Sequence, residues 1–213
     1  MEILFSDKDI IVCIKPCGVL SQADVNGKSN MIDLLKAEFK TDIFPIHRLD
    51  REVGGVMVYA KNKTSASSLS VQVQNGSFSK EYIAMIHSKP SEESGEMVDF
   101  LFKDSSKNKS FVVKKERKGV KKAILNYELI KSFMINDKEF SIVKIKLVTG
   151  RTHQIRVQFS SRKMQLIGDR KYGANDDFKT IGLWSYKISF VHPNTKEILN
   201  FVKEPENLIN QYM

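Results

Sequence analysis

The longest run without a polar side chain, about Val53 to Ala60, is only as long as a β-strand. Because a helix that spans a bilayer needs roughly 18 apolar residues or more, we expect no membrane association. Short apolar runs recur along the chain between turn-rich breaks, and only a few segments repeat their apolar residues at helical spacing. This pattern predicts a compact α+β domain with a large mixed sheet.

Several elements can be placed by their end signals. Ile3–Phe5 and Ile10–Ile14 flank the turn-rich residues 6–9, which predicts a strand pair. A helix is expected over residues 31–39 with Asn30 as its N-cap, and another from Lys63 to a terminating Gly76. Thr152 is expected to cap a helix that carries Ile155 and Phe159. Further strands are expected at 56–61, 80–86, 123–131, 140–147, 166–168, 182–190 and 198–202.

The charge balance favours an anionic partner. The 213 residues include 34 Lys+Arg and 25 Asp+Glu, a net charge of +9, while 41% hydrophobic residues exclude a disordered chain. Nucleic acid is the simplest such partner. One segment, residues 103–122, holds nine of the cations and is expected to be a mobile hairpin or loop that projects from the body; it either contacts RNA or is merely solvated. Its cations are Lys103, Lys107, Lys109, Lys114, Lys115, Arg117, Lys118, Lys121 and Lys122, against the acids Asp104 and Glu116.

Cysteine and histidine usage does not indicate a metal centre. Cys13 and Cys17 have no second Cys/His pair, so neither a zinc site nor a disulfide is expected. The four histidines are expected to be structural hydrogen-bonding groups. The chain opens on a strand-and-turn pattern instead of a charged and apolar leader, which indicates a cytoplasmic protein. Nothing resembles a coiled-coil seam, so we expect a monomer.

Two segments embed charged residues in apolar sequence beside a glycine and a strand end: residues 46–51 and 149–156. In the first, Asp50 is bracketed by Arg48 and Arg51, and such cations keep a carboxylate ionised. It is then suited to act as a nucleophile or base, or else it is an ion-paired residue that stitches a loop to the sheet. No second carboxylate lies in either segment, which disfavours the usual glycosidase chemistry.

The same segments carry a family resemblance. Residues 47–61, beginning His47-Arg48-Leu49-Asp50, look like the HRLD motif of the RluA family of RNA pseudouridine synthases. Residues 147–156 resemble that family's second signature, which residues 167–173 continue. The opening segment 9–18 and the closing segment 190–193 match as well. The resemblance therefore runs from about residue 3 to 205.

The resemblance implies a pseudouridine synthase-like fold, a mainly antiparallel sheet with a central cleft. It implies that residues 1–213 form a single catalytic domain, without a separate N-terminal RNA-binding domain, that isomerises uridine in structured rRNA or tRNA by base flipping. No metal or organic cofactor is implied. By likeness, Asp50 is the catalytic aspartate, Arg48 helps to hold the base out of the helix, Tyr82 packs on the uracil, Arg156 pairs with the aspartate and Ile155 lines the pocket.

The sequence departs from the family pattern at two places. Val53-Gly54 replaces the more usual Thr-Ser, and Trp184 stands where many members have histidine. Two other functions remain open: a non-catalytic RNA-binding or ribosome-assembly factor on the same fold, and a uridine-directed glycosidase that releases uracil.

Overall fold

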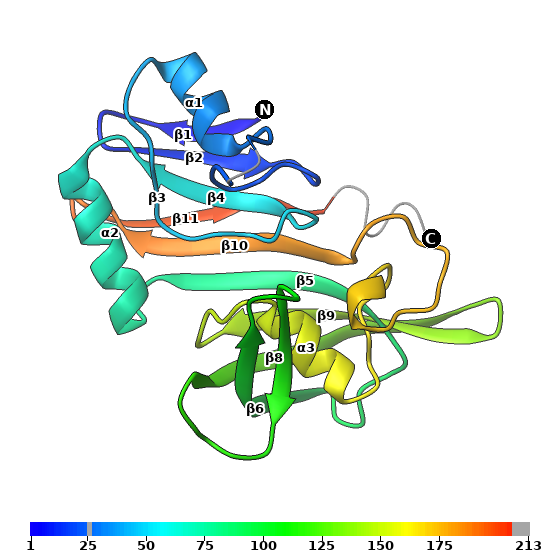
Figure 1. Ribbon diagram of the computed structural model, residues 1–213. Coiled ribbons are helices and arrows are strands. Elements are labelled where there is room, and N and C mark those ends of the chain that lie inside the picture. Colours follow the sequence, from blue (N-terminus) through cyan, green and yellow to red (C-terminus); the bar gives the residue numbers. More distant parts are fainter. Residues whose placement is uncertain (25–26, 206–213) are drawn as a thin grey trace. The chain divides into compact units, whose positions relative to one another are not determined.

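Figure 1 shows the computed structural model, which describes residues 1–24 and 27–205. The chain is an α+β protein with many strands and few helices, as the sequence predicts. Its described residues divide into two compact units: unit 1 is residues 1–80 with 184–205, and unit 2 is Glu81–Leu183. Within the described ranges, no helix is both long enough and apolar enough to cross a membrane.

Unit 1 contains a mixed group of strands and two helices. Its elements are β1 (Ile3–Ser6), β2 (Ile10–Lys15), α1 (Met31–Phe39), β3 (Phe44–Pro45), β4 (Gly54–Ala60), α2 (Lys63–Asn75), β10 (Leu183–Val191) and β11 (Ile198–Val202). β2 pairs antiparallel with β1 and β4, while β4 pairs in parallel with β10. β11 runs antiparallel to β10, and β3 antiparallel to β4. All residues of β2 and β4 are buried, which explains why their sequences are apolar up to Lys15, the last residue of β2.

The predicted helix ends of unit 1 are confirmed. The side chain of Asn30 accepts the N–H of Asp33 and begins α1. α2 begins at Asn62, which accepts the N–H of Ser65, and it ends at Gly76 in the left-handed conformation (φ 80°). That conformation suits glycine, which lacks the Cβ that would clash.

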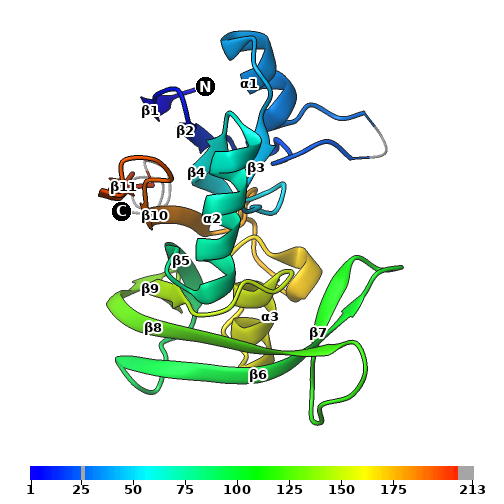
Figure 2. The same ribbon diagram turned by 90° about the vertical axis from the view of Figure 1, so that its left-hand side faces the viewer.

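Unit 2 is an antiparallel sheet with one helix against it. Its elements are β5 (Ser79–His87), β6 (Ser94–Asp104), β7 (Lys109–Val113), β8 (Val120–Ile135), β9 (Lys138–Leu147), α3 (Gln154–Ser161) and the 3₁₀ turn η1 (Arg170–Tyr172). The strand order is β5-β9-β8-β6-β7. Figure 2 shows α3 on one side of β8 and β6. There Leu101, Ala123, Val157 and Tyr172 form a buried apolar cluster.

The basic segment 103–122 includes the end of β6, β7 and the start of β8, so the predicted hairpin is present. Several hydrogen bonds anchor it to the body of unit 2, two of them at Ser110. The N–H of Ser110 donates to the hydroxyl of Tyr172, and the Ser110 hydroxyl donates to the carbonyl of Thr152. The hairpin is therefore packed on the unit instead of merely projecting from it.

Two local predictions are wrong. Thr152 does not cap α3; the N-cap position is His153, in the left-handed region (φ 52°) and without a side-chain cap bond. The side chain of Gln154 instead accepts the N–H of Arg151, so a residue inside the helix holds the entering chain. Residues 166–168 form no strand, because only Leu166 makes an isolated bridge, to Ile86.

Candidate functional site

Asp50 lies in the turn that leads into β4. Two hydrogen bonds fix the residue before it: the N–H of Leu49 donates to Ser21 Oγ (3.0 Å), and the Ser21 hydroxyl donates to the Leu49 carbonyl (2.9 Å). The N–H of Val53 closes the turn on the Asp50 carbonyl (3.0 Å). Leu49 is buried, Arg48 is exposed and Asp50 is half-buried. The loop therefore fixes the backbone on both sides of Asp50, and the residue itself is only partly buried.

A buried lysine fastens this turn to the end of β2. Nζ of Lys15 donates to the carbonyls of Pro16 (2.9 Å), Val19 (2.6 Å) and Arg51 (3.1 Å). Gly18 and Arg51 add two more bonds, since the Gly18 N–H donates to the Arg51 carbonyl and Arg51 Nε donates to the Gly18 carbonyl. Five hydrogen bonds thus tie the 15–19 segment together and to the residue after Asp50.

Burial lowers the pKa of Lys15 to about 8, and the nearby charges of Glu52 and Asp50 oppose that effect. The Lys15 side chain is fully buried. Sequence reasoning assigned it no role in the site. The sequence feature that could have indicated a buried role for Lys15 is its position, at the end of an apolar run and directly before a proline.

His47 is a structural neighbour of the Asp50 turn. Its Nε2 accepts the N–H of Val58 (3.4 Å), and its ring packs against Phe78 at a centroid distance of 5.4 Å. Burial, and then the charge of Lys80, lower the pKa of His47 to about 3. The ring is therefore neutral near pH 7 and unsuited to donate a proton. All four histidines hydrogen-bond within the protein, as predicted.

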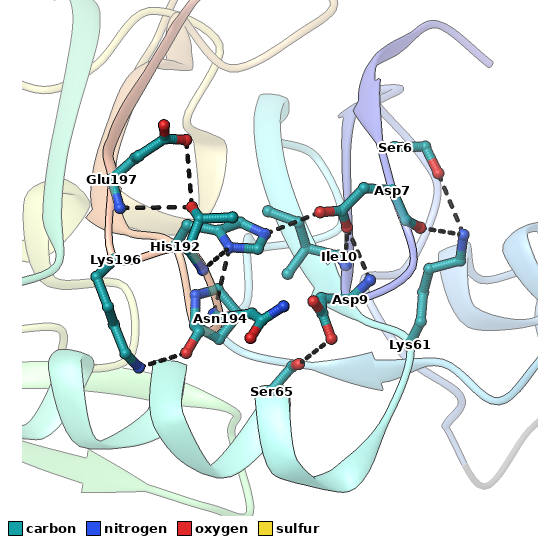
Figure 3. Close-up of polar contacts among 12 residues, drawn as sticks. Ser6, Asp7, Asp9, Ile10, Lys61, Ser65, His192, Asn194, Lys196 and Glu197 are labelled. Carbon is teal, nitrogen blue, oxygen red and sulfur yellow. Dashed lines mark hydrogen bonds and ion pairs between the residues drawn. The ribbon is translucent and has the colours of Figure 1, made fainter.

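Figure 3 shows the one described group of side chains whose spacing resembles a metal site, Asp7, Asp9 and His192. Nδ1 of His192 accepts the N–H groups of Asn194 (3.2 Å) and Thr195 (3.0 Å), so its ring proton lies on Nε2. That nitrogen donates to Asp7 Oδ2 (2.9 Å), whose other oxygen accepts the Asp9 N–H. A metal would need a lone pair at Nε2. The cluster instead fastens the first turn of the chain to the turn after β10.

In unit 2, Tyr82 and Ile155 are both buried. Tyr82 lies on β5 in register with Ile145 of β9, and 5% of it is exposed. Ile155 lies in the first turn of α3 and is 4% exposed. Both therefore occupy fixed positions in the unit.

Arg156, the next residue of α3, is held by an ion pair. Its Nε donates to Asp169 Oδ2 (2.7 Å) and its Nη2 to Asp169 Oδ1 (2.8 Å). Both side chains are buried, and the guanidinium also lies over the Tyr172 ring (5.1 Å to its centroid). Such a fork-to-carboxylate contact fixes the direction of an arginine. Sequence reasoning included Asp169 in a motif but did not find its partner.

The five predicted site residues fall in both units. Arg48 and Asp50 belong to unit 1, and Tyr82, Ile155 and Arg156 belong to unit 2. The expected pairing of Arg156 with Asp50 therefore stays a prediction. Within unit 1, the geometry provides a half-buried aspartate on a fixed backbone, and a carboxylate can act as a nucleophile or a base.

A family model and the curated relatives of this chain all point to the same protein family. The family model described as RNA pseudouridylate synthase matches residues 9–161. An uncharacterized RNA pseudouridine synthase of Aquifex aeolicus is 31% identical over 233 residues, covering 100% of this chain and 72% of the relative. The ribosomal large subunit pseudouridine synthase D of Borreliella burgdorferi is 32% identical over 202 residues, covering 88% of this chain and 60% of the relative. The chain thus spans 60 to 72% of the length of these two relatives.

Among solved structures, human RNA Pseudouridylate Synthase Domain Containing 1 superposes with a TM-score of 0.81 at 20% identity. The match covers 99% of this chain and 85% of the human chain. It confirms the predicted fold class.

Proposed function

Because the chain belongs to the family of RNA pseudouridylate synthases, we propose that it isomerises uridine to pseudouridine within RNA, with Asp50 as the catalytic aspartate. The matched family segment includes parts of both units, and residues 1–213 are proposed to act as a single catalytic domain. The observation that supports the proposal is the Asp50 turn, where Lys15 and Ser21 hold the backbone on either side of a half-buried Asp50.

The reaction is an isomerisation and needs no co-reactant. The bond between N1 of uracil and C1′ of ribose breaks, the base turns, and a bond from C5 to C1′ forms. The proton on C5 leaves to solvent and N1 gains one, so atoms and electrons balance. Asp50 attacks the ribose or the base, or removes a ribose proton, and all three routes require it to be ionised.

Four further residues are proposed to contact the RNA. The exposed Arg48 is suited to enter the base stack that the flipped uridine leaves. Tyr82 is proposed to provide a stacking face for the uracil and Ile155 an apolar wall. Arg156, aimed by Asp169, is proposed to pair with the catalytic carboxylate.

Structured RNA, either rRNA or tRNA, is the proposed substrate. One relative is named for the large ribosomal subunit, so ribosomal RNA is the first substrate to test. The excess positive charge fits such a polyanion. A cytoplasmic monomer without a metal or organic cofactor completes the proposal.

The test is tritium release from RNA that carries uridine labelled at C5. The wild-type chain should release tritium, Asp50→Asn should abolish release, and RNA affinity should stay within a few-fold. Asp42→Asn is the matched control, because that aspartate belongs to the same unit and its side chain is 77% exposed. Turnover by Asp50→Asn would remove Asp50 from the mechanism.

The two alternatives give different products. A non-catalytic RNA-binding factor would bind RNA and release no tritium even as wild type. A uridine-directed glycosidase would yield free uracil and an abasic site, whereas an isomerase leaves the base attached to the ribose through C5.

A further inference from the structure

The sheet of unit 2 has a second face, turned away from α3. Leu101 of β6 is buried with Val157 of α3. Because successive side chains of a strand point to opposite faces, its neighbours Phe100 and Phe102 point away from the helix. Figure 2 shows that this side of β6 and β8 faces away from α3.

Aromatic side chains line up on that face. Phe102 lies in register with Phe111 of β7, and Phe100 with Val113. Phe111 is 37% exposed, and Phe100 and Phe102 are partly exposed. We call Phe100, Phe102 and Phe111 the aromatic strip. A soluble protein rarely leaves such rings in a row on its surface without a use for them.

Cations surround the aromatic strip. The Arg117 guanidinium lies 5.7 Å from the Phe102 ring centroid, and Nζ of Lys109 lies 5.7 Å from that of Phe111. Lys122 stands opposite Phe100 in the register of β6 and β8. Exposed lysines of the β7–β8 connection, Lys114, Lys115 and Lys118, extend the charge. The only acids between residues 103 and 122 are Asp104 and Glu116.

We propose that the aromatic strip, with its flanking cations, is a platform on which unpaired bases of the RNA stack while lysine and arginine hold the phosphates. The inference rests on the proposed function, which makes RNA the partner. Flat rings among cations on an open sheet suit single-stranded nucleic acid, because any base has a face to stack and each nucleotide carries a phosphate. A second copy of this chain fits less well, since it would place two such basic segments against each other.

The experiment is fluorescence anisotropy of a fluorescein-labelled oligouridylate with the full chain. Phe111→Ala should weaken binding by about ten-fold, the size of one lost stacking contact. Phe111→Tyr should bind like wild type, because it keeps the ring. Ile130→Ala is the matched control, since this residue of β8 is 53% exposed and lies outside the strip.

A second probe, polyglutamate, carries negative charge without bases. Phe111→Ala should leave the affinity for polyglutamate unchanged. Arg117→Gln should lower the affinity for both probes and reduce the dependence of that affinity on salt concentration. If Phe111→Ala binds oligouridylate as tightly as the wild-type protein does, the proposal is overturned. Equal losses of affinity for both probes in Phe111→Ala overturn it too.

A protein interface is the remaining competitor for this face. If Phe111→Ala converts a dimer into a monomer in sedimentation and leaves RNA affinity intact, the strip is a contact between copies and the proposal fails. Failure of the proposed function shows separately, as absent tritium release by wild-type protein that still binds the oligouridylate.

Discussion

Trp184 packs directly on Gly54, its partner in the parallel pairing of β10 and β4. A Cβ at residue 54 would lie 2.6 Å from Cζ3 of the indole, closer than side-chain atoms approach. The indole is fixed from its other end, because Nε1 donates to the Lys203 carbonyl (2.8 Å). In the sequence, the glycine and the tryptophan are two separate departures from the family pattern, and the structure places them against each other.

Gly54→Ser should therefore lower the stability of the protein that has Trp184. It should lower the stability less when a smaller side chain replaces Trp184. We expect a loss of about 1–3 kcal/mol in the free energy of unfolding for Gly54→Ser alone, from overpacking. In the Trp184→His background the same substitution should cost clearly less. Urea unfolding of the four proteins measures the coupling. Equal costs in both backgrounds would show that the two residues act independently.

The elements of this fold were predictable from sequence because their signals are local. Asn30 and Gly76 mark helix ends with their own side chain or backbone, and the apolar run of β4 shows that both its faces are buried. The partners of Lys15 and Arg156 were not predictable in this way. The Arg51 carbonyl and the Asp169 carboxylate are brought to them by tertiary packing. The prediction that Thr152 caps α3 was wrong because it used only the preference of threonine for N-cap positions. The backbone of His153 is left-handed, so the helix begins one residue later.

Lys15→Met should destabilise the protein and change how its stability depends on pH. The carbonyls of Pro16, Val19 and Arg51 would lose their donor, at a cost of about 1–3 kcal/mol for a buried group left unpaired. The pKa of Lys15 is about 8 in the folded chain and 10.5 ordinarily, so the unfolded chain binds more protons between those values. The wild-type free energy of unfolding should therefore gain from this group as pH rises from 8 to 10.5.

Comparing wild type with Lys15→Met isolates the contribution of Lys15 to the pH dependence, since all other titrating groups are present in both proteins. Urea unfolding at pH 8 and at pH 10.5 should show the gap between wild type and Lys15→Met widening at the higher pH. A gap that narrows would contradict the lowered pKa.

His47 should make the protein sensitive to acid. Its pKa is about 3 when folded and 6.5 ordinarily, so the unfolded chain takes up a proton that the folded chain refuses. Stability from the neutral ring is present above pH 6.5 and is lost as pH falls towards 3, by about 1.4 kcal/mol per pH unit. His47→Gln should flatten this part of the curve. Chemical denaturation at several pH values between 6.5 and 4 checks it, and parallel curves for the two proteins would exclude His47 as the cause.

Asp169→Asn should damage the protein more than removal of the whole ion pair. The substitution removes the Asp169 carboxylate from the buried Arg156 guanidinium, and breaking a buried pair in this way costs about 3–5 kcal/mol. Arg156→Met combined with Asp169→Asn removes the buried guanidinium as well as the carboxylate, so the double variant should regain much of the lost stability. Thermal unfolding of the two variants and wild type measures this, with the exposed Asp177→Asn as the control. A double variant no more stable than Asp169→Asn would mean that the cost comes from lost packing and not from the loss of the Asp169 charge beside Arg156.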